Sequence, residues 1–246
     1  MNTHRTTEIY SEAFKAFLDY TDEKVVLLEA LTRRLQALGT LTLLDIGAGN
    51  GALSIPLAKT VKRYVALEQK ADYAQRLQNA GLEVIHAPFP CKITDKFDVV
   101  LISHSLPSHS DGREGWEPFV SAAWRQVNSR GHLLIVTFED EESEWNDLVT
   151  RSGMEEVKPH QKRLESLNDY LRSYGIVRQD SITTHVRTDN LDDMVRALAF
   201  VWSDGRAKHM EAFLNNKAIV EHLETNYRTS AGYEFPFHHY MVDTHR

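Results

Sequence analysis

The stretch LTLLDIGAGNGALSIPLA, residues 41–58, decides the fold. An apolar run with the length of a buried strand comes first, three glycines follow within five positions, and the last part has the spacing of a helix start. Glycines at a strand-to-helix turn let a ligand approach the backbone, and the first N–H groups of the helix have no partners within it. The stretch therefore predicts a ligand-binding loop in an α/β sheet.

The glycine spacing is compatible with more than one ligand. A phosphate loop of the nucleotide hydrolase kind needs Lys and Ser/Thr directly after its last glycine, whereas Ala and Leu follow Gly51, so this type of loop is excluded. The dinucleotide pattern G-x-G-x-x-G/A is satisfied by Gly47, Gly49 and Ala52, and Glu68 ends the next apolar run about 20 residues further on. By spacing alone a nicotinamide or flavin site stays open.

Strand-like and helix-like segments alternate around this loop. The apolar runs are LTLLDI, RYVALE, LEVIH, FDVVLIS and HLLIVTF. Amphipathic segments lie between them, near residues 52–62, 70–80 and 113–129, and Gly131 is expected to close the last one. Later strands are expected within 175–188 and 233–245, and later helices near 189–203 and 207–224. Such alternation predicts a doubly wound α/β fold with a seven-stranded, mostly parallel sheet covered on both faces.

The first 39 residues have the apolar spacing of two helices. The apolar positions of the first are Ile9, Ala13, Phe14, Phe17 and Leu18, and those of the second are Val25, Leu28, Leu31, Leu35 and Leu38. Thr21 or Asp22 is expected to cap the second helix and Gly39 to end it. The sequence therefore predicts a helical cap before the sheet.

Composition limits the class of protein. The chain has 246 residues, 42% of them hydrophobic, and no linker or repeat, which predicts one domain over 1–246: a substrate cap at 1–39, a cofactor half at 40–140 and a substrate-side half at 141–246. The net charge of −7 opposes a broad basic face for nucleic acid. The single Cys91, the lack of an apolar signal segment and the lack of a membrane-length apolar run predict a cytoplasmic protein with no membrane partner.

LLDIGAGNGALSIPLA followed by VALE resembles motif I and the acidic second strand of class I S-adenosylmethionine-dependent methyltransferases. The resemblance continues through FDVVLISHSLPSH and GHLLIVTF, which are similar to the family's fourth strand with its loop and to its fifth strand. Asp45 before the loop and the long helical segment before the strand favour this Rossmann-like family over dinucleotide enzymes. The resemblance implies methyl transfer with S-adenosylmethionine as cofactor.

The resemblance implies roles for the residues around the loop. Glu68, with two acceptor oxygens, is expected to take both ribose hydroxyls, and Asp45 to orient the loop or accept from the cofactor ammonium. Ala87, Pro88 and Phe89 are expected to border the adenine, although many relatives carry an Asp there. The expected cofactor-binding residues are Asp45, Gly47, Ala48, Gly49, Glu68, Gln69, Ala87, Pro88, Phe89 and Ser103.

Two further stretches resemble the histamine N-methyltransferase family. YSEAFKAFLDYTDEK, residues 10–24, is similar to its opening helix and turn, and RLESLNDYLRSYGIVRQDSITTHVRTDNLDDMVRALAFVW has its order of elements. Carried across by position, the resemblance makes Glu23 the substrate-binding glutamate and Tyr10, Phe14 and Phe17 an aromatic wall. Core packing is the alternative interpretation for these aromatic residues, and a helix-dipole role is the alternative for Glu23.

The same resemblance departs from the family where amides are expected. A glutamine after the fourth strand corresponds to His104, and an asparagine near the last strand falls on the Pro236–Phe237 region. The implied acceptor is therefore a small nitrogenous molecule other than histamine. Because histidine titrates near pH 6.5, His104 is the candidate catalytic base, with a solvated loop histidine as the alternative. Trp202 and Tyr240 are candidate pocket residues from the C-terminal half.

Other functions stay open at this stage. An O-methyltransferase of a natural-product hydroxyl and a catalytically silent cofactor-binding protein are the alternatives. RNA adenine methyltransferases usually carry an N/D-P-P-Y-like tetrad after the fourth strand, whereas residues 103–106 read SHSL, without an aromatic stacker. No metal is expected, because His238 and His239 point to opposite faces of a strand and no H-x-x-x-H pair occurs. The acceptor and the oligomeric state are not predicted.

Overall fold

The computed structural model describes most of the chain. The described residues are 13–39, 41–107, 115–138, 143–151, 153, 163–203 and 207–246, without the side chains of 163, 202, 203, 207 and 208. Tyr10 and the side chain of Trp202, both expected near the substrate, lie outside this part of the chain.

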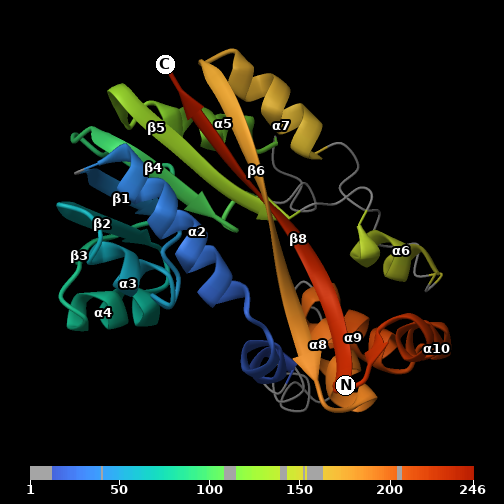
Figure 1. The fold of residues 1–246 in the computed structure, drawn as a ribbon. Coiled ribbons are helices and arrows are strands. Elements are labelled where there is room, and N and C mark those ends of the chain that lie inside the picture. Colours follow the sequence, from blue (N-terminus) through green and yellow to red (C-terminus); the bar gives the residue numbers. More distant parts are fainter. Residues whose placement is uncertain are drawn as a thin grey trace. The chain divides into compact units, whose positions relative to one another are not determined.

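A mixed sheet contains the predicted strands. Its strands are β1 (Thr42–Ile46), β2 (Arg63–Glu68), β3 (Glu83–His86), β4 (Phe97–Ser103), β5 (Val127–Phe138), β6 (Ile176–Thr188), β7 (Arg228–Thr229) and β8 (Gly232–His245). The order is β3-β2-β1-β4-β5-β8-β6, and the short β7 pairs with β8 (Figure 1). Neighbouring strands from β3 to β5 are parallel, and β8 is antiparallel to β5. The predicted fold class, with seven main strands, is confirmed.

Helices connect these strands. Residues 13–20 are helical. The further helices of the described chain are α2 (Glu23–Leu38), α3 (Ser54–Ala58), α4 (Ala71–Asn79), α5 (Glu117–Trp124), α6 (Glu144–Arg151), α7 (Arg163–Arg172), α8 (Leu191–Ser203), α9 (Ala207–Leu214) and α10 (Lys217–Asn226). The single helix expected near 207–224 is two helices, because the Asn216 side chain accepts the N–H groups of Ala218 and Ile219 and starts α10 as its N-cap. None of the described helices is long and apolar enough to cross a membrane.

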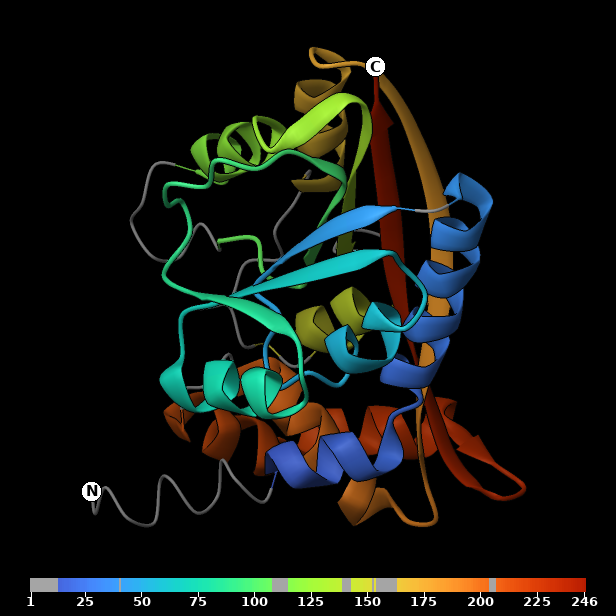
Figure 2. The same cartoon turned by 90° about the vertical axis from the view of Figure 1, so that its left-hand side faces the viewer.

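Helices cover both faces of the parallel strands. Leu44 and Ile46 of β1 belong to an apolar cluster that includes residues of α5 and α7, whereas Leu43 belongs to a cluster that includes residues of α2 and α3. Figure 2 shows the helices on either side of these strands. Successive strand residues point to opposite faces, so each strand contributes to both clusters. Burial on both faces explains why the strands appear in the sequence as nearly continuous apolar runs.

The buried face of α2 differs from the predicted one. Leu27, Leu31 and Leu35 are 0–1% exposed, whereas Val25, expected on the apolar face, is 70% exposed. These three leucines are four residues apart and lie on one face of the helix. Because the helix turns by about 100° per residue, Val25, two residues before Leu27, is rotated by about 200° and points to the opposite face. The prediction for Val25 was therefore wrong, and Leu18 of the preceding helix, 38% exposed, was also misplaced.

The expected helix end at Gly131 was also wrong, because β5 begins at Val127. Phe97 of β4 pairs with Val127 but Val99 pairs with His132, so the register shifts at this point. A Cβ atom on Gly131 would lie 2.7 Å from the backbone oxygen of Asp98. Gly131 thus permits a close approach of two strands at a bulge and does not end a helix.

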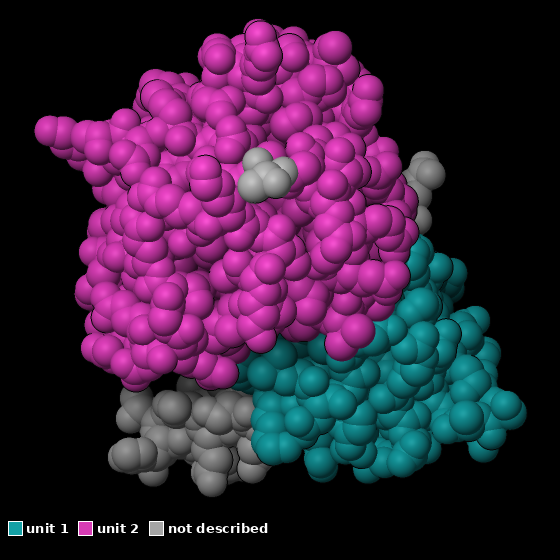
Figure 3. Space-filling view, turned by 60° about the vertical axis from the view of Figure 1, so that its left-hand side comes forward, with its two compact units in different colours: residues 1–23, 139–161, 183–238 teal, residues 24–138, 162–182, 239–246 magenta. Residues whose placement is uncertain are grey.

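Contacts divide the chain into two compact units, coloured in Figure 3. Unit 1 comprises residues 1–23, 139–161 and 183–238, and unit 2 comprises 24–138, 162–182 and 239–246. Unit 2 holds the parallel strands and nearly all of α2, so this helix, expected in a substrate cap, covers a face of the sheet. Unit 1 holds the expected aromatic residues Phe14 and Phe17.

Candidate functional site

The glycine loop follows β1 at the carboxyl ends of the parallel strands. Gly47, Gly49 and Gly51 have φ angles of 81°, 60° and 87°, in the left-handed region that favours glycine. A Cβ atom on Gly47 would lie 2.5 Å from the Cβ of Ser105, whose hydroxyl donates to the Ile46 carbonyl at 2.6 Å. The glycine loop therefore packs directly against the segment after β4.

Asp45 connects the loop to two neighbouring elements. This carboxyl group is 3% exposed, and its Oδ2 accepts from Ser54 Oγ at 2.6 Å and from the Tyr64 hydroxyl at 2.5 Å. Ser54 Oγ also lies 3.0 Å from the carbonyl oxygen of Ala48 in the loop. Burial raises the pKa of Asp45, although the hydrogen bonds from Ser54 and Tyr64 lower it. Asp45 thus contacts the loop through Ser54, in keeping with the first of its two expected roles; a contact with the cofactor ammonium stays a prediction.

Glu68 faces the loop from the end of β2. The side chain is 5% exposed, and Oε2 accepts the N–H of Gly49 while Oε1 accepts the N–H of Lys70, both at 2.7 Å. Two backbone donors therefore fix the carboxylate. Because a carboxylate oxygen has more than one acceptor site, both oxygens retain capacity for a ribose hydroxyl, the role that the sequence predicts.

A cavity of about 170 Å³ lies on the loop. Its lining residues are Lys24, Asp45, Gly47, Ala48, Gly49, Asn50, Ala52, Leu53, Ser54, Leu101 and Ser103. Ser103 Oγ is buried and has no hydrogen-bond partner in the described part of the chain. Lys24 was not predicted as a site residue, and no motif marks it, since only the packing of α2 brings it to the loop. The wall thus offers a cation, a carboxyl group and a hydroxyl in a small space.

His104 is the first residue after β4. Its φ angle of 51° is uncommon for a residue other than glycine. Its ring centroid lies 4.4 Å from that of Phe138 and 5.2 Å from that of His239, a fully buried residue that the sequence did not predict near the site. Because Ser105 contacts Gly47, the backbone at His104 is held beside the glycine loop.

The residues expected around the adenine follow β3. The N–H of Ala87 donates to the Glu68 carbonyl at 3.2 Å, whereas the carbonyl of Gln69 contacts His86 Nε2. The Phe89 ring packs edge-on against Phe119, with 4.9 Å between centroids, and is half-buried. Pro88 is exposed. Of these positions, Ala87 contacts the Glu68 backbone at the end of β2, and the cofactor roles of all of them stay predictions.

The expected substrate residues lie in both units. In unit 1, Phe14 and Phe17 both pack against Phe200, with centroid distances of 4.9 and 5.4 Å, and Phe17 is 6% exposed. Glu23 begins α2, is 4% exposed, and donates its N–H to Thr21 Oγ1, so Thr21 has the predicted capping role. In unit 2, the half-buried Tyr240 of β8 pairs with Thr137. Phe17 thus packs within unit 1, and its expected role at the substrate stays a prediction.

Comparisons with known proteins relate to the site and to the fold. A sequence model of the ribosomal RNA adenine dimethylase family matches residues 19–89, which include α2, the glycine loop and the first three strands. No curated protein matches the sequence.

Solved structures cover nearly the whole chain at low identity. The YcgJ protein from Bacillus subtilis has a TM-score of 0.58 at 13% identity, with 89% of this chain and 98% of that chain covered. A SAM-dependent methyltransferase from Thiobacillus denitrificans, in complex with S-adenosyl-L-homocysteine, has 0.56 at 15%, with 92% of each covered. Precorrin-6y C5,15-methyltransferase from Geobacter metallireducens GS-15 has 0.50 at 16%, with 88% and 86% covered. These similarities show the fold.

The strand order, the antiparallel β8 and the glycine loop after β1 define a class I methyltransferase fold. The family match over residues 19–89 falls on the same glycine loop, in agreement with the methyltransferase family that the sequence resembles. The structure from Thiobacillus denitrificans contains S-adenosyl-L-homocysteine, the product form of the cofactor that the sequence predicts for this chain.

Proposed function

We propose that the protein transfers a methyl group to a nitrogen atom of a small molecule, in the manner of the histamine N-methyltransferases that its sequence resembles but on an acceptor other than histamine. The position of His104 carries this proposal. It is the first residue after β4, and Ser105 next to it contacts Gly47 of the glycine loop. An imidazole beside the cofactor loop is suited to take a proton from an acceptor nitrogen.

The residues around the loop fit the cofactor. When bound, S-adenosylmethionine supplies a methyl group activated by a sulfonium. Glu68 orients the ribose through its two oxygens, and the glycines leave room for the methionine part. Lys24 and Asp45 line the same cavity and suit a carboxylate and an ammonium, while Ser103 Oγ, which lacks a partner among the described residues, has a donor and acceptor to offer.

In this mechanism the protein aligns the acceptor and removes one proton. Bound S-adenosylmethionine would supply the methyl group to the acceptor nitrogen and keep the electron pair of the broken carbon–sulfur bond on its sulfur. The nitrogen's proton passes to the His104 imidazole. Alignment contributes the larger part, up to about 7–11 kcal/mol in favourable intramolecular reactions. The base contributes roughly 10²- to 10⁴-fold in rate.

Substrate contacts are assigned to the N-terminal segment and the last strand. Glu23 is proposed to bind a positively charged or N–H group of the acceptor, with Tyr10, Phe14 and Phe17 as apolar contacts. Trp202 and Tyr240 are proposed as further substrate contacts. We also propose that residues 1–246 form a single domain and that the protein is cytoplasmic. Subcellular fractionation tests the location.

An adenine base in RNA is a second candidate acceptor, favoured by the match to the ribosomal RNA adenine dimethylase family. The matched residues 19–89 end before β4, so they contain none of the residues expected to hold a flipped base. The net charge of −7 also disfavours a nucleic acid, because affinity for RNA depends largely on cationic contacts to phosphates. O-methylation of a natural-product hydroxyl and cofactor binding without turnover are the remaining alternatives.

A labelling experiment tests these candidates together. The protein is incubated with methyl-labelled S-adenosylmethionine and, separately, with a host metabolite extract, an amine and imidazole panel, a hydroxyl panel and ribosomal RNA. A labelled N-methyl small molecule is the expected product. Label in RNA or on oxygen would replace the proposal by the corresponding alternative, and cofactor binding without any labelled product would favour the silent protein.

The role of His104 is tested on the product found. His104→Ala is expected to lower kcat by about 100-fold or more and to remove the part of the pH dependence of kcat that comes from protonation of this imidazole. His222→Ala, which changes a histidine paired with Asp147 in unit 1, is the control and should leave the pH profile unchanged. Full kcat at every pH in His104→Ala would disprove the base assignment.

A further inference from the structure

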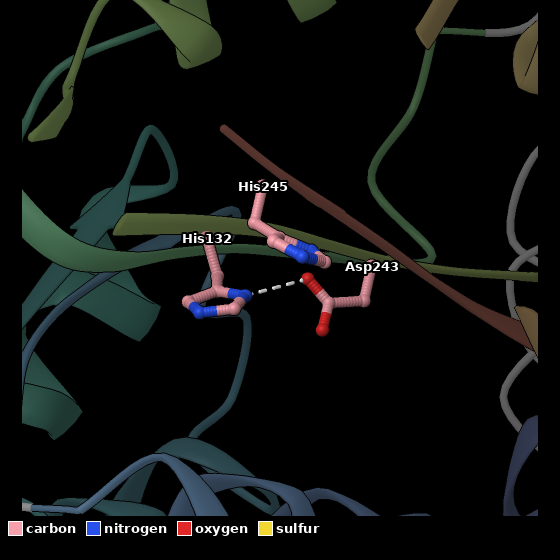
Figure 4. A group of neighbouring side chains, drawn as sticks. All are labelled: His132, Asp243 and His245. Atoms are coloured by element: carbon pink, nitrogen blue, oxygen red, sulfur yellow. Dashed lines mark hydrogen bonds and ion pairs between the residues drawn. The ribbon is translucent and has the colours of Figure 1, made fainter. Parts of the chain in front are cut away.

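A cluster of three metal-binding side chains lies in unit 2, away from the glycine loop. His132 comes from β5, and Asp243 and His245 come from the end of β8 (Figure 4). One ligand atom from each lies within 4.8 Å of the others. None of the three belongs to the expected cofactor or substrate residues. The sequence predicted no metal from His238 and His239, which are not members of this cluster.

Strand pairing explains why these side chains meet. His132 and His245 are directly opposite each other in the antiparallel pair of β5 and β8, and Asp243 is two residues from His245 on the same face. The two imidazole centroids are 5.0 Å apart, and His132 Nδ1 lies 2.8 Å from Asp243 Oδ1. Two paired strands thus fix the three donors without help from a loop.

The surroundings leave the donors available to a ligand. Asp243 is 2% exposed, and its second oxygen accepts from Arg34 of α2, which orients the first oxygen toward His132. His245 Nδ1 is buried and has no hydrogen-bond partner in the described part of the chain. Second-shell donors of this kind fix the orientation of metal-binding carboxylates. A buried nitrogen without a partner is costly unless a ligand satisfies it.

The donor set selects a class of cation. Two imidazole nitrogens and one carboxylate oxygen suit zinc and related transition metals, whereas magnesium and calcium prefer oxygen ligands. Zinc bonds of about 2.0–2.2 Å in a tetrahedron place ligand atoms roughly 3.3 Å apart, so small side-chain rotations suffice. The Arg34 guanidinium beside Asp243 opposes a dication and predicts weaker binding than at a site with several carboxylates.

We propose that His132, Asp243 and His245 form a zinc-binding site that ties the end of β8 to β5. Val99 of β4 pairs with His132 and also with Leu43 of β1, so the cluster is level with the start of the parallel strands, at the edge opposite to the glycine loop. The metal therefore has a structural role here and takes no part in methyl transfer. A metal that binds only the folded state stabilises it by an amount that grows with the logarithm of the ratio of metal concentration to Kd.

Zinc titration of the whole protein, followed by calorimetry and thermal unfolding, tests the site. The wild-type protein is expected to bind one zinc ion at the cluster and, at a hundredfold excess of zinc over Kd, to gain about 5 °C or more in Tm. His245→Ala should weaken binding by more than the roughly 10- to 100-fold that loss of an outer-shell partner costs, and should abolish the Tm gain. Magnesium should give no gain.

Two controls make the result specific to this cluster. His222→Ala removes another histidine paired with an aspartate, since His222 Nε2 lies 3.4 Å from Asp147 Oδ2, and it should keep the full response to zinc. In the wild-type protein, zinc should protect His132 and His245 from diethylpyrocarbonate, as read by mass spectrometry, even if a variant folds poorly. No zinc binding, an undiminished response in His245→Ala or no protection of the two histidines would each overturn the proposal.

Discussion

Two buried aspartates at opposite edges of one sheet are held in different ways. Asp45 at the glycine loop is 3% exposed and accepts from two neutral hydroxyl groups, those of Ser54 and Tyr64. Asp243 at the other edge is 2% exposed and has a cationic partner, Arg34, together with His132. The two carboxyl groups are almost equally buried, but the hydrogen-bond donors to Asp45 are neutral hydroxyl groups, whereas those to Asp243 include a guanidinium.

The two kinds of partner connect each aspartate to a different part of the molecule. Neutral donors connect Asp45 to the glycine loop, and burial raises the pKa of its carboxyl group. A charged partner connects Asp243 to α2, so an ion pair joins the last strand to a helix from the other end of the chain. A broken buried ion pair leaves an uncompensated charge, whereas a broken neutral hydrogen bond costs less. We therefore expect the free energy of unfolding to fall more when the partners of Asp243, near the amino ends of the parallel strands, are removed than when those of Asp45, near the carboxyl ends, are removed.

The largest effect is expected at Arg34. Arg34→Ala leaves Asp243 without its cationic partner and should lower the free energy of unfolding by about 3 kcal/mol. Its neighbour Arg33 pairs with Glu29 on the exposed side of the same helix, so Arg33→Ala is a matched control and should cost well under 1 kcal/mol. Urea unfolding of both variants measures the difference. Equal losses in the two variants would remove the contrast between the edges.

At the carboxyl ends of the parallel strands, the loss of Glu68 is expected to have the largest effect on cofactor binding. Glu68→Ala removes the acceptor of two backbone N–H groups and of the ribose hydroxyls, so the Kd for S-adenosylmethionine should rise by about 100-fold. Glu83→Ala on the neighbouring strand is the control, because Glu83 pairs with Arg63 at the surface and is expected to leave Kd within about twofold. Calorimetry measures both constants, and a Kd for Glu68→Ala close to that of the wild type would refute the ribose assignment.

The smallest effect concerns the pH dependence of stability. Since the folded state raises the pKa of Asp45, it binds more protons than the unfolded state above the ordinary value of 3.8, and stability falls as pH rises through this window. Asp45→Asn keeps an acceptor oxygen and should remove this fall, by about 1.4 kcal/mol for each unit of the shift. Urea unfolding between pH 4 and 8 measures it.

Asp98 is a matched control for Asp45, because the folded state shifts the pKa of its carboxyl group in the opposite direction. Burial raises its pKa, but donors from Thr42 and Asn128 outweigh burial, so the net shift is downward. Its contribution to stability is therefore present above pH 3.8 and is lost as pH falls toward the lowered pKa. Asp98→Asn should lose stability relative to the wild type at neutral pH and much less in acid. The same sign of pH dependence for both variants would contradict the assignment at Asp45.

Local patterns predicted the strands well. The runs RYVALE and FDVVLIS coincide with β2 and β4, because buried parallel strands are apolar on both faces and are bounded by polar residues. The loop at Gly47, the acid at Glu68 and the residue after β4 were also found from sequence, since the carboxyl ends of parallel strands meet at one edge. Their proximity in the structure agrees with that expectation.

Features that depend on packing were not predicted. The exposure of Val25 depends on which stripe of α2 faces the sheet, and the strand conformation at Gly131 depends on its pairing with β4. Lys24 and His239 reach the site only through the packing of a helix and the pairing of the last strand. A local search for metal motifs could not find His132 together with Asp243 and His245, more than 100 residues away. The D-x-H spacing at 243–245, on one face of a strand, is the one signal that sequence offered.

The sequence by itself determined the fold class and the position of the glycine loop, because backbone geometry at Gly47 and alternating apolar runs act over short distances along the chain. Tertiary structure alone decided which face of α2 is buried, which residues neighbour His104, and that His132 meets the end of β8. Those contacts join distant parts of the chain, and the free energy of burying apolar surface and satisfying buried polar groups selects them only when the whole sheet is assembled.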